Sequence, residues 1–265
     1  MRIVSWNCHY GFDGKKPETI KEYGADILVI PECREMDMKG SGYDEKHHDW
    51  YGDHKEATDT LGNINKEKDL GIGIFWKDDI VITQLPDWER SWSKESNFRY
   101  LVPYSVKSVK GIFESFTLIT VWTKNKMDTS DPLEYIQKAH AAVDHYKSIG
   151  LLDGRVILIG DFNSNAIWDN LYREECNHSK LVKKLEELGI KDCSNSLTKD
   201  EFNTYYYYYK KKEYRVIIDY CFASDELVKS PNFTVPKSDE WKEKDGIKRW
   251  RGLSDHCPII VDLAL

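Results

Sequence analysis

The sequence is poor in the features that define several classes of protein. None of its six cysteines forms a Cys-x-x-Cys pair, which argues against a cysteine-bound metal or a redox pair. No apolar run approaches the ~18 residues of a membrane span, and a strand-like segment begins at once, without a signal peptide. We therefore expect a soluble, cytoplasmic protein with no membrane partner, in which cysteines serve as small buried hydrophobic residues.

Excess positive charge and linker segments are also missing. The net charge of −7 argues against a protein that coats nucleic acid electrostatically. No stretch rich in Gly, Ser or Pro divides the 265 residues, so we expect a single domain over residues 1–265. The Gly71-x-Gly73 segment has no third glycine that opens a helix, which favours a closely packed strand over a dinucleotide-binding loop.

Basic and aromatic residues are nevertheless concentrated locally. Residues 210–215 hold four bases against one acid, and residues 237–251 hold six against four. Such segments are either solvated loops or guides for a phosphate-bearing substrate, and the sequence leaves both interpretations open. Five consecutive tyrosines, Tyr205 to Tyr209, favour a strand packed in a sandwich, with base stacking as the alternative.

The hydrophobic pattern predicts an α/β chain that is rich in strands. Helices are expected at residues 17–23, 132–149 and 180–188; Asp131 caps the second, Pro132 is its first residue, and Ser179 caps the third. The expected strands are 2–6, 27–31, 71–76, 80–84, 100–108, 116–122, 155–160, 204–209, 214–222 and 258–264.

Polar side chains that can carry chemistry border five of the apolar runs. The most informative is Gly160-Asp161-Phe162-Asn163, in which Asp161 can hold Mg²⁺ or a water and Asn163 can donate to a phosphate oxygen. The other four are Asn7, Glu32, Asp219 and the pair Asp255-His256. Buried strands seldom border such groups without a functional reason, so we expect the five to share one pocket.

These motifs resemble the endonuclease/exonuclease/phosphatase superfamily, which includes DNase I-like and exonuclease III-like enzymes. They occur in the family's order and span residues 6 to 256. The resemblance implies a four-layer α/β/β/α sandwich, in which two packed mixed β-sheets are flanked by helices. The matching motifs are Trp6-Asn7, Pro31-Glu32, Gly160-Asp161-Phe162-Asn163, Ile218-Asp219-Tyr220 and Ser254-Asp255-His256.

The resemblance also implies the roles of the site residues. Asn7, Glu32, Asp161 and Asp255 offer an all-oxygen site that suits Mg²⁺ or Mn²⁺. Asp161, Asn163, Asp219 and His256 are the expected catalytic residues. Asp219 is expected to hydrogen-bond His256, which then acts as a general base on water or as a cationic donor to the phosphate.

The chain departs from the family pattern at Trp122. Many members have a histidine or tyrosine there that touches the scissile phosphate, whereas an indole is a donor only. We expect Trp122 to pack in the core or to form an aromatic wall, and Thr123, Lys124 or Asn125 to be candidates for the phosphate contact. A further polar cluster, formed by His47, His48, Asp49, Asp53 and His54, is interpreted as a solvated loop, with a second metal site as the alternative.

The leading hypothesis is a monomeric, Mg²⁺-dependent phosphodiester hydrolase. We expect it to be a nuclease that cleaves DNA or RNA by metal-assisted attack of water on phosphorus. One alternative is a phosphatase or phosphodiesterase for a small molecule or lipid headgroup with the same catalytic residues. A second, from another class, is a non-catalytic binding module that retains the fold.

Overall fold

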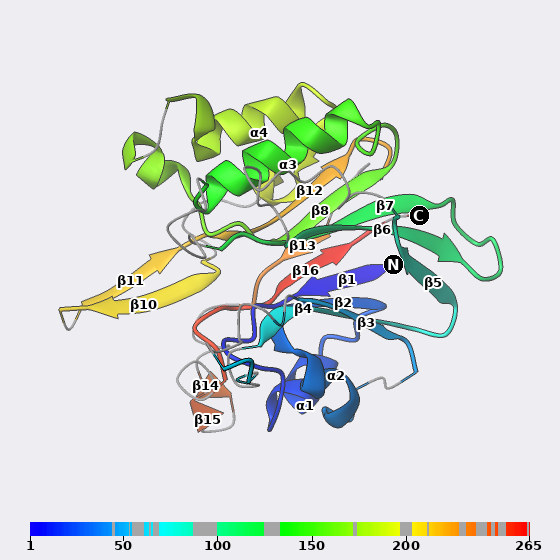
Figure 1. The fold of residues 1–265 in the computed structure, drawn as a ribbon, viewed down its shortest axis with the longest axis vertical. Coiled ribbons are helices and arrows are strands. Elements are labelled where there is room, and N and C mark those ends of the chain that lie inside the picture. Colours follow the sequence, from blue (N-terminus) through cyan, green and yellow to red (C-terminus); the bar gives the residue numbers. More distant parts are fainter. Residues whose placement is uncertain are drawn as a thin grey trace. The chain divides into compact units, whose positions relative to one another are not determined.

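The chain forms two compact units, each assembled from segments that are distant in the sequence (Figure 1). The first unit comprises Met1–Asp78, Ser194–Ile217 and Asn232–Asp262, and the second comprises Asp79–Cys193, Ile218–Pro231 and Leu263–Leu265. The computed structural model describes residues 1–43, 46–52, 54, 61–63, 65, 69–86, 100–124, 133–171, 174–196, 203–210, 212–227, 232–236, 243–244, 247–248, 253–263 and 265.

A six-stranded mixed sheet forms the centre of the first unit. Its strand order is β13-β16-β1-β2-β4-β3, and only β1 and β2 are parallel. Two short helices, α1 and α2, belong to the same unit. The bounds are β1 Arg2–Ser5, α1 Lys16–Lys21, β2 Ile27–Arg34, α2 Glu35–Gly40, β3 His48–Gly52, β4 Leu70–Trp76, β13 Asn232–Thr234 and β16 Ile259–Asp262.

The parallel pair β1 and β2 determines where the polar strand ends lie. Val4 pairs with Leu28 and Ser5 with Val29, and all four side chains are buried. Because the two strands run in parallel, Asn7, just after β1, and Glu32, near the end of β2, lie at the same side of the sheet. The apolar residues of the two strands thus form the core, and these two polar residues are brought together.

The second unit is built on another six-stranded mixed sheet, ordered β5-β6-β7-β8-β12-β9, in which only β7 and β8 are parallel. Helices α3 and α4 contact each other, and α4 also contacts β9. The bounds are β5 Ile80–Gln84, β6 Leu101–Ser108, β7 Phe116–Trp122, α3 Ile136–Ser148, β8 Val156–Asp161, η2 Ala166–Leu171, η3 Glu174–Cys176, α4 His178–Glu186, β9 Ile190–Asp192 and β12 Asp219–Ser224.

Two small two-stranded sheets complete the described elements. β10 (Tyr205–Tyr209) pairs with β11 (Lys212–Val216), and β14 (Glu243–Lys244) pairs with β15 (Ile247–Lys248). Both sheets belong to the first unit, as does the turn η4 (Cys193–Ser196) from Ser194 onward. The tyrosine run therefore forms its own hairpin, and the prediction that it packs in a sandwich is wrong.

Most predicted strands are present, and the α/β class with two mixed sheets and helices is confirmed. The predicted strand 214–222 is wrong, because β11 ends at Val216 and β12 begins at Asp219. The sequence did not predict α2, β3, β9, β13, β14 or β15. Among the described helices, none is long and apolar enough to cross a membrane.

The helix boundaries show which local signals were misleading. α3 begins at Ile136, after Tyr135 with a φ of 38°, so its predicted start was too early; Asp131 and Pro132 lie outside the described residues. α4 is capped by Asn177, whose side chain accepts a hydrogen bond from the Lys180 amide, and not by Ser179. All six cysteines are free, and five of them are buried, including Cys8, Cys33 and Cys257, for which burial was predicted.

We predict that Gly160→Ala destabilises the protein far more than Gly154→Ala. Both glycines have a left-handed φ, 145° and 84°, but a Cβ on Gly160 would lie 2.0 Å from the Val121 carbonyl oxygen, and one on Gly154 would meet nothing within 4 Å. We expect a loss of about 3 kcal/mol or more at Gly160 and about 1 kcal/mol at Gly154. Denaturant unfolding of both variants tests this, and equal losses would contradict the close approach of β7 to β8.

Candidate active site

Asn7 and Glu32 form the centre of the polar group in the first unit. The Asn7 amide nitrogen donates to Glu32 Oε1 at 3.0 Å, and the Tyr10 backbone amide donates to Glu32 Oε2 at 3.2 Å. The Asn7 side-chain oxygen accepts from the His9 amide at 3.0 Å. Asn7 is buried, with 1 % of its surface exposed, so the pair is a fixed cluster of oxygen atoms at the edge of the sheet.

Local backbone strain directs Glu32 toward Asn7. Glu32 has a φ of 61° and lies where the register between β2 and β4 shifts, between Pro31 and Cys33. A residue at such a bulge is turned out of the alternation of the strand. A left-handed φ at a non-glycine residue is costly and persists only where the surroundings enforce it.

A buried lysine holds the loop that follows Asn7. Lys16 Nζ donates to the carbonyl oxygens of Cys8, His9 and Gly11 at 2.7, 2.9 and 2.7 Å. His9 and Tyr10 both have left-handed φ values, 50° and 59°. The ammonium group therefore binds three carbonyls of a strained loop. This role was not predicted, because Lys16 precedes Pro17 in an ordinary helix start.

Ser254 and Trp6 attach the C-terminal motif to the end of β1. Ser254 Oγ donates to the Asn7 carbonyl oxygen at 2.7 Å and accepts from the His256 amide at 3.0 Å. The Trp6 indole nitrogen donates to the His256 carbonyl oxygen at 3.0 Å. Trp6 is fully buried, which confirms that it packs in the core, and its polar atom also fixes the backbone of His256.

His9 and Asp255 form an ion pair beside this cluster. His9 Nδ1 lies 3.1 Å from Asp255 Oδ1. Burial opposes ionisation of Asp255, but the bond from His9 and the positive charges of His256 and His9 outweigh it, so the pKa of Asp255 is lowered. The hydrogen bond to Asp255 raises the pKa of His9. His9 was not among the predicted site residues.

His256 is buried and has an aromatic neighbour. It is 5 % exposed, its ring centroid lies 4.8 Å from that of Tyr205, and the backbones of the two residues form an isolated β-bridge. The tyrosine hairpin thus begins at the predicted catalytic histidine.

In the second unit, Asp161 and Asp219 lie at the adjoining ends of two neighbouring strands. Asp161 is the last residue of β8, Asp219 is the first of β12, and the two are directly paired across the antiparallel ladder. Both are buried, with 1 % and 2 % of their surface exposed. Burial of two neighbouring acids requires compensating donors or a cation.

Asn163 and Thr123 organise the loop after Asp161. The Asn163 backbone amide donates to Asp161 Oδ1 and its side-chain amide to Asp161 Oδ2, both at 2.8 Å. The same side-chain nitrogen donates to the Thr123 carbonyl oxygen at 2.9 Å, and Thr123 Oγ1 donates to the Phe162 carbonyl oxygen at 2.6 Å. Asn163 therefore orients Asp161. If the Asn163 side chain donated to a phosphate, it would give up its bond to Asp161 Oδ2 or to the Thr123 carbonyl oxygen.

Trp122 belongs to the core of the second unit. It is 4 % exposed and packs edge-to-face on Tyr100, with ring centroids 5.0 Å apart. Lys124 Nζ lies 4.5 Å from the Trp122 ring and 4.8 Å from that of Tyr100. The packing role is confirmed. Thr123 is fully buried, which disfavours it as a phosphate contact, and Asn125 lies outside the described residues.

The predicted polar cluster around His47 does not assemble as one group. His48 and Asp49 lie in β3, so the prediction of a loop is wrong there, and His47 pairs with Asp78. Asp53 lies outside the described residues. His54 contacts Glu35 and Asp69, which are not the acidic residues that the sequence suggested.

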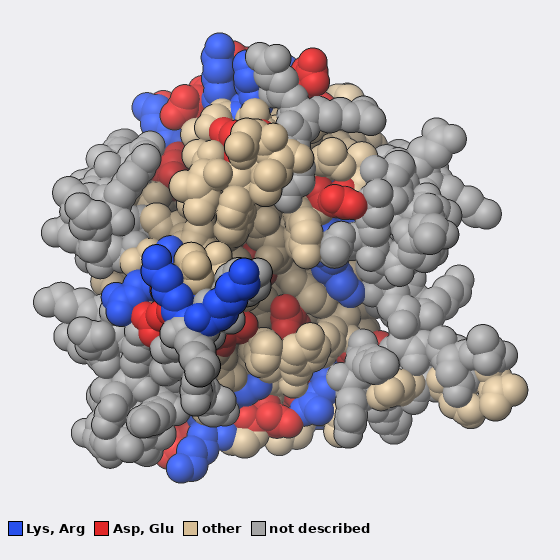
Figure 2. Space-filling model, turned by 90° about the vertical axis from the view of Figure 1, so that its left-hand side faces the viewer, with Lys and Arg blue, Asp and Glu red and all other residues tan. Residues whose placement is uncertain are grey.

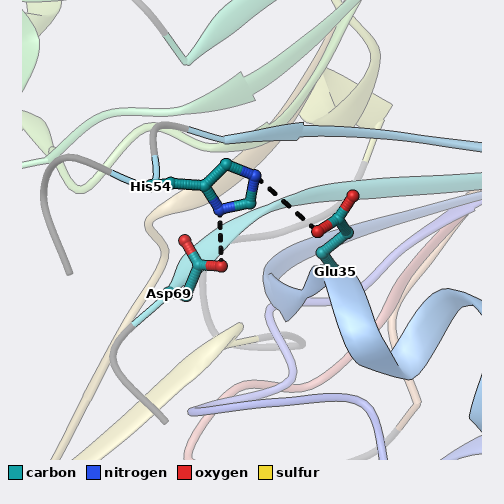
Figure 3. Close-up of side chains that lie close together, drawn as sticks. All are labelled: Glu35, His54 and Asp69. Carbon is teal, nitrogen blue, oxygen red and sulfur yellow. Dashed lines mark hydrogen bonds and ion pairs between the residues drawn. The ribbon is translucent and has the colours of Figure 1, made fainter. Parts of the chain in front are cut away.

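His54 lies between Glu35 and Asp69 (Figure 3). Its Nδ1 is 2.8 Å from Asp69 Oδ2 and its Nε2 is 3.7 Å from Glu35 Oε2, and its ring stacks on Trp50. One imidazole and two carboxylates are a donor set that suits a transition metal. Since both ring nitrogens face a carboxylate, the arrangement is an ion-paired cluster that joins α2 to the start of β4.

The basic segment at 210–215 forms the end of the tyrosine hairpin. Lys210 and Lys212 are exposed, and Arg215 pairs with Glu213 at 2.7 Å. Figure 2 shows the side toward which this hairpin points in Figure 1, and Lys and Arg side chains gather there. The side chains of 237–251 lie outside the described part of the chain.

The structure thus places the predicted residues in two groups. The first unit brings together Asn7, Glu32, Asp255 and His256, and the second unit brings together Asp161, Asn163 and Asp219.

A model of the Endonuclease/Exonuclease/phosphatase family matches residues 4–256. No curated protein matches the chain. Among solved structures, the 3'-5' exonuclease NExo from Neisseria meningitidis is 17% identical, with a TM-score of 0.59 and 100% of both chains covered. An AP endonuclease from Archaeoglobus fulgidus is 16% identical, with a TM-score of 0.60 and 100% of both chains covered. TDP2 from C. elegans is 15% identical, with a TM-score of 0.62, covering 100% of this chain and 75% of that one. These similarities show that the fold is DNase I-like, as predicted.

We predict that Trp122→His destabilises the protein. The substitution replaces a buried indole that contacts Tyr100 and Lys124, and large-to-small changes at such positions typically cost about 3 kcal/mol or more. Tyr10→His, at a side chain that is 63% exposed, should change the melting temperature little. A Trp122→His protein with the wild-type melting temperature would contradict the packing role.

Proposed function

The chain belongs to the endonuclease/exonuclease/phosphatase family, hydrolases of phosphate esters, and we propose that it is a Mg²⁺-dependent phosphodiesterase that cleaves nucleic acid. The observation that carries the proposal is the pair formed by buried Asn7 and half-buried Glu32, which is fixed by hydrogen bonds. Pairs of this kind hold oxygen ligands in place before a cation binds.

The donor set fits a hard divalent cation. Asn7, Glu32 and Asp255 in the first unit and Asp161 in the second offer only oxygen atoms. The nearby thiol of Cys8 is fully buried, and burial raises its pKa, so it stays protonated and is a poor ligand. Mg²⁺, or Mn²⁺ in its place, supplies polarisation of a phosphoryl oxygen and stabilises charge on the leaving oxygen.

We assign proton chemistry to the remaining residues. His256 removes a proton from the attacking water or donates to the phosphate, and Asp219 favours its charged form. Asp161, held by both nitrogens of Asn163, orients the water. The family model spans residues 4–256 and so includes all of these residues.

Nucleic acid is the proposed substrate because two of the similar structures are a 3'-5' exonuclease and an AP endonuclease, and because an exposed basic hairpin belongs to this chain. A small-molecule or lipid-headgroup phosphodiester is the second candidate, favoured by the net charge of −7. A non-catalytic binding module would not need the complete set of predicted site residues, which is Asn7, Glu32, Asp161, Asn163, Asp219, Asp255 and His256. We also propose that the protein is a cytoplasmic monomer that folds as one domain.

We predict that Glu32→Gln and Asp161→Asn each reduce metal-dependent hydrolysis of bis-p-nitrophenyl phosphate by at least about 100-fold. Glu187→Gln, at an exposed position on the flank of α4, is the matched control and should retain wild-type activity. Calorimetry should show weaker Mg²⁺ binding in Glu32→Gln. Wild-type hydrolysis that EDTA does not affect would refute the metal requirement.

We predict that Asp219 and His256 act as a pair. Asp219→Asn and His256→Ala should each lower kcat by about 100-fold or more with little change in KM, and the double variant should lose no more than the worse single one. Asp225→Asn, at an exposed acid after β12, is the control. Multiplicative losses in the double variant would show that the two side chains act independently.

A further inference from the structure

The tyrosine run forms one continuous row of aromatic rings that starts at His256. The ring of Tyr205 lies 4.8 Å from that of His256, Tyr207 lies 5.6 Å from Tyr205, and Tyr214 lies 5.0 Å from Tyr207. The last two pairs are stacked, with interplanar angles of 23° and 13°. All four residues belong to the first unit.

Strand geometry explains why these rings share a face. Tyr205 and Tyr207 are two residues apart on β10, and Tyr214 is the direct cross-strand partner of Tyr207. Tyr206 points to the opposite face: it is 1 % exposed, its hydroxyl donates to the Asn203 carbonyl oxygen, and Arg215 lies over its ring. One face of the hairpin is therefore anchored, and the other carries the row.

The row remains accessible to solvent. Tyr205, Tyr207 and Tyr214 are partly exposed, in contrast to Tyr206. Among the described strands, β10 and β11 pair only with each other along their length, apart from the bridge to His256, and Figure 1 shows them as a separate ribbon. These three side chains are thus in part accessible to a ligand.

Positive charge lies at the outer end of the row. Lys212 Nζ lies 5.4 Å from the centre of the Tyr214 ring, and Lys210 at the turn is exposed. Aromatic rings next to exposed cations suit a chain that alternates planar groups with phosphates. In a duplex, neighbouring base pairs cover the faces of each base. A ligand whose bases are to stack on the tyrosines must therefore have unpaired bases.

We propose that Tyr205, Tyr207 and Tyr214 form a stacking platform for unpaired bases of single-stranded nucleic acid, leading to the phosphate at His256. This rests on the proposed function, because it assigns the substrate class of the same site. Stacking accepts every base, so the platform selects single strands without selecting sequence.

The test compares two ligands with equal charge. A fluorescent oligothymidylate of about ten nucleotides and an abasic strand of the same length are titrated by anisotropy with the full chain in EDTA. The wild type should bind the oligothymidylate about tenfold or more tighter than the abasic strand, because only the former can stack. Tyr207→Ile and Tyr214→Ile should lose this difference, whereas Tyr207→Phe, which keeps the ring, should retain it.

A purely structural row predicts a different result. Isoleucine preserves strand propensity, and the melting temperature reports any loss of the hairpin. Equal affinity of the wild type for both strands, or a retained difference in Tyr207→Ile at an unchanged melting temperature, would overturn the platform.

Hydrolysis separates this inference from the proposed function. If bis-p-nitrophenyl phosphate is cleaved and the base-dependent difference is absent, only the platform is wrong. If the difference is present and no phosphodiester is cleaved, only the catalytic proposal is wrong.

Discussion

The carboxylate of Glu32 is the point on which the first unit's polar group depends. It accepts from the Asn7 side chain and the Tyr10 amide, and these two bonds tie the segment after β1 to Glu32 in β2. The left-handed backbone at Glu32 and in the loop after Asn7 is costly, and Lys16 offsets that cost by gathering three of the loop's carbonyls. Removing either charged partner would leave buried polar atoms unsatisfied.

The second unit uses the same physical solution with different residues. Asp161 ends a fully buried strand, and both nitrogens of Asn163 satisfy its two oxygens. Thr123 extends the arrangement to the end of β7. Ser164, the residue after Asn163, is held by buried His178, whose Nδ1 lies 2.9 Å from Ser164 Oγ. Burial lowers the pKa of His178 to about 4, so this histidine is neutral at pH 7. In both units, hydrogen bonds within the protein order a loop around a carboxylate, which is the condition for catalysis by positioning.

The sequence was most informative where polar residues interrupt apolar runs. Asn7, Glu32, Asp161 and Asp219 were identified this way, because a buried strand that ends in an acid is unusual enough to carry information. The residues that position them were not predicted: Lys16, Ser254 and Thr123 act through backbone carbonyls that no side-chain pattern reveals. The cap of α4 was misplaced from Asn177 to Ser179 because both residue types are good caps. β3 was missed because His48, Asp49 and Trp50 lack the apolar alternation of a strand, and its partner β4 supplies the buried residues instead.

The acidic composition and a polyanionic substrate are compatible if affinity comes from two different sources. Phosphate contacts weaken as salt rises because they act by releasing counterions, and a chain with a net charge of −7 gains little from long-range attraction. Stacking between rings and bases carries no net charge and is far less sensitive to salt. In the first unit, Lys210 and Lys212 lie at the outer end of the aromatic row, while Asp255 lies beside the histidine at its inner end. Negative charge thus lies at the proposed cation site, and the uncharged rings lie between it and the basic turn. On this view the tyrosine run would allow an acidic protein to hold a nucleic acid strand without neutralising the residues that we propose to bind the metal.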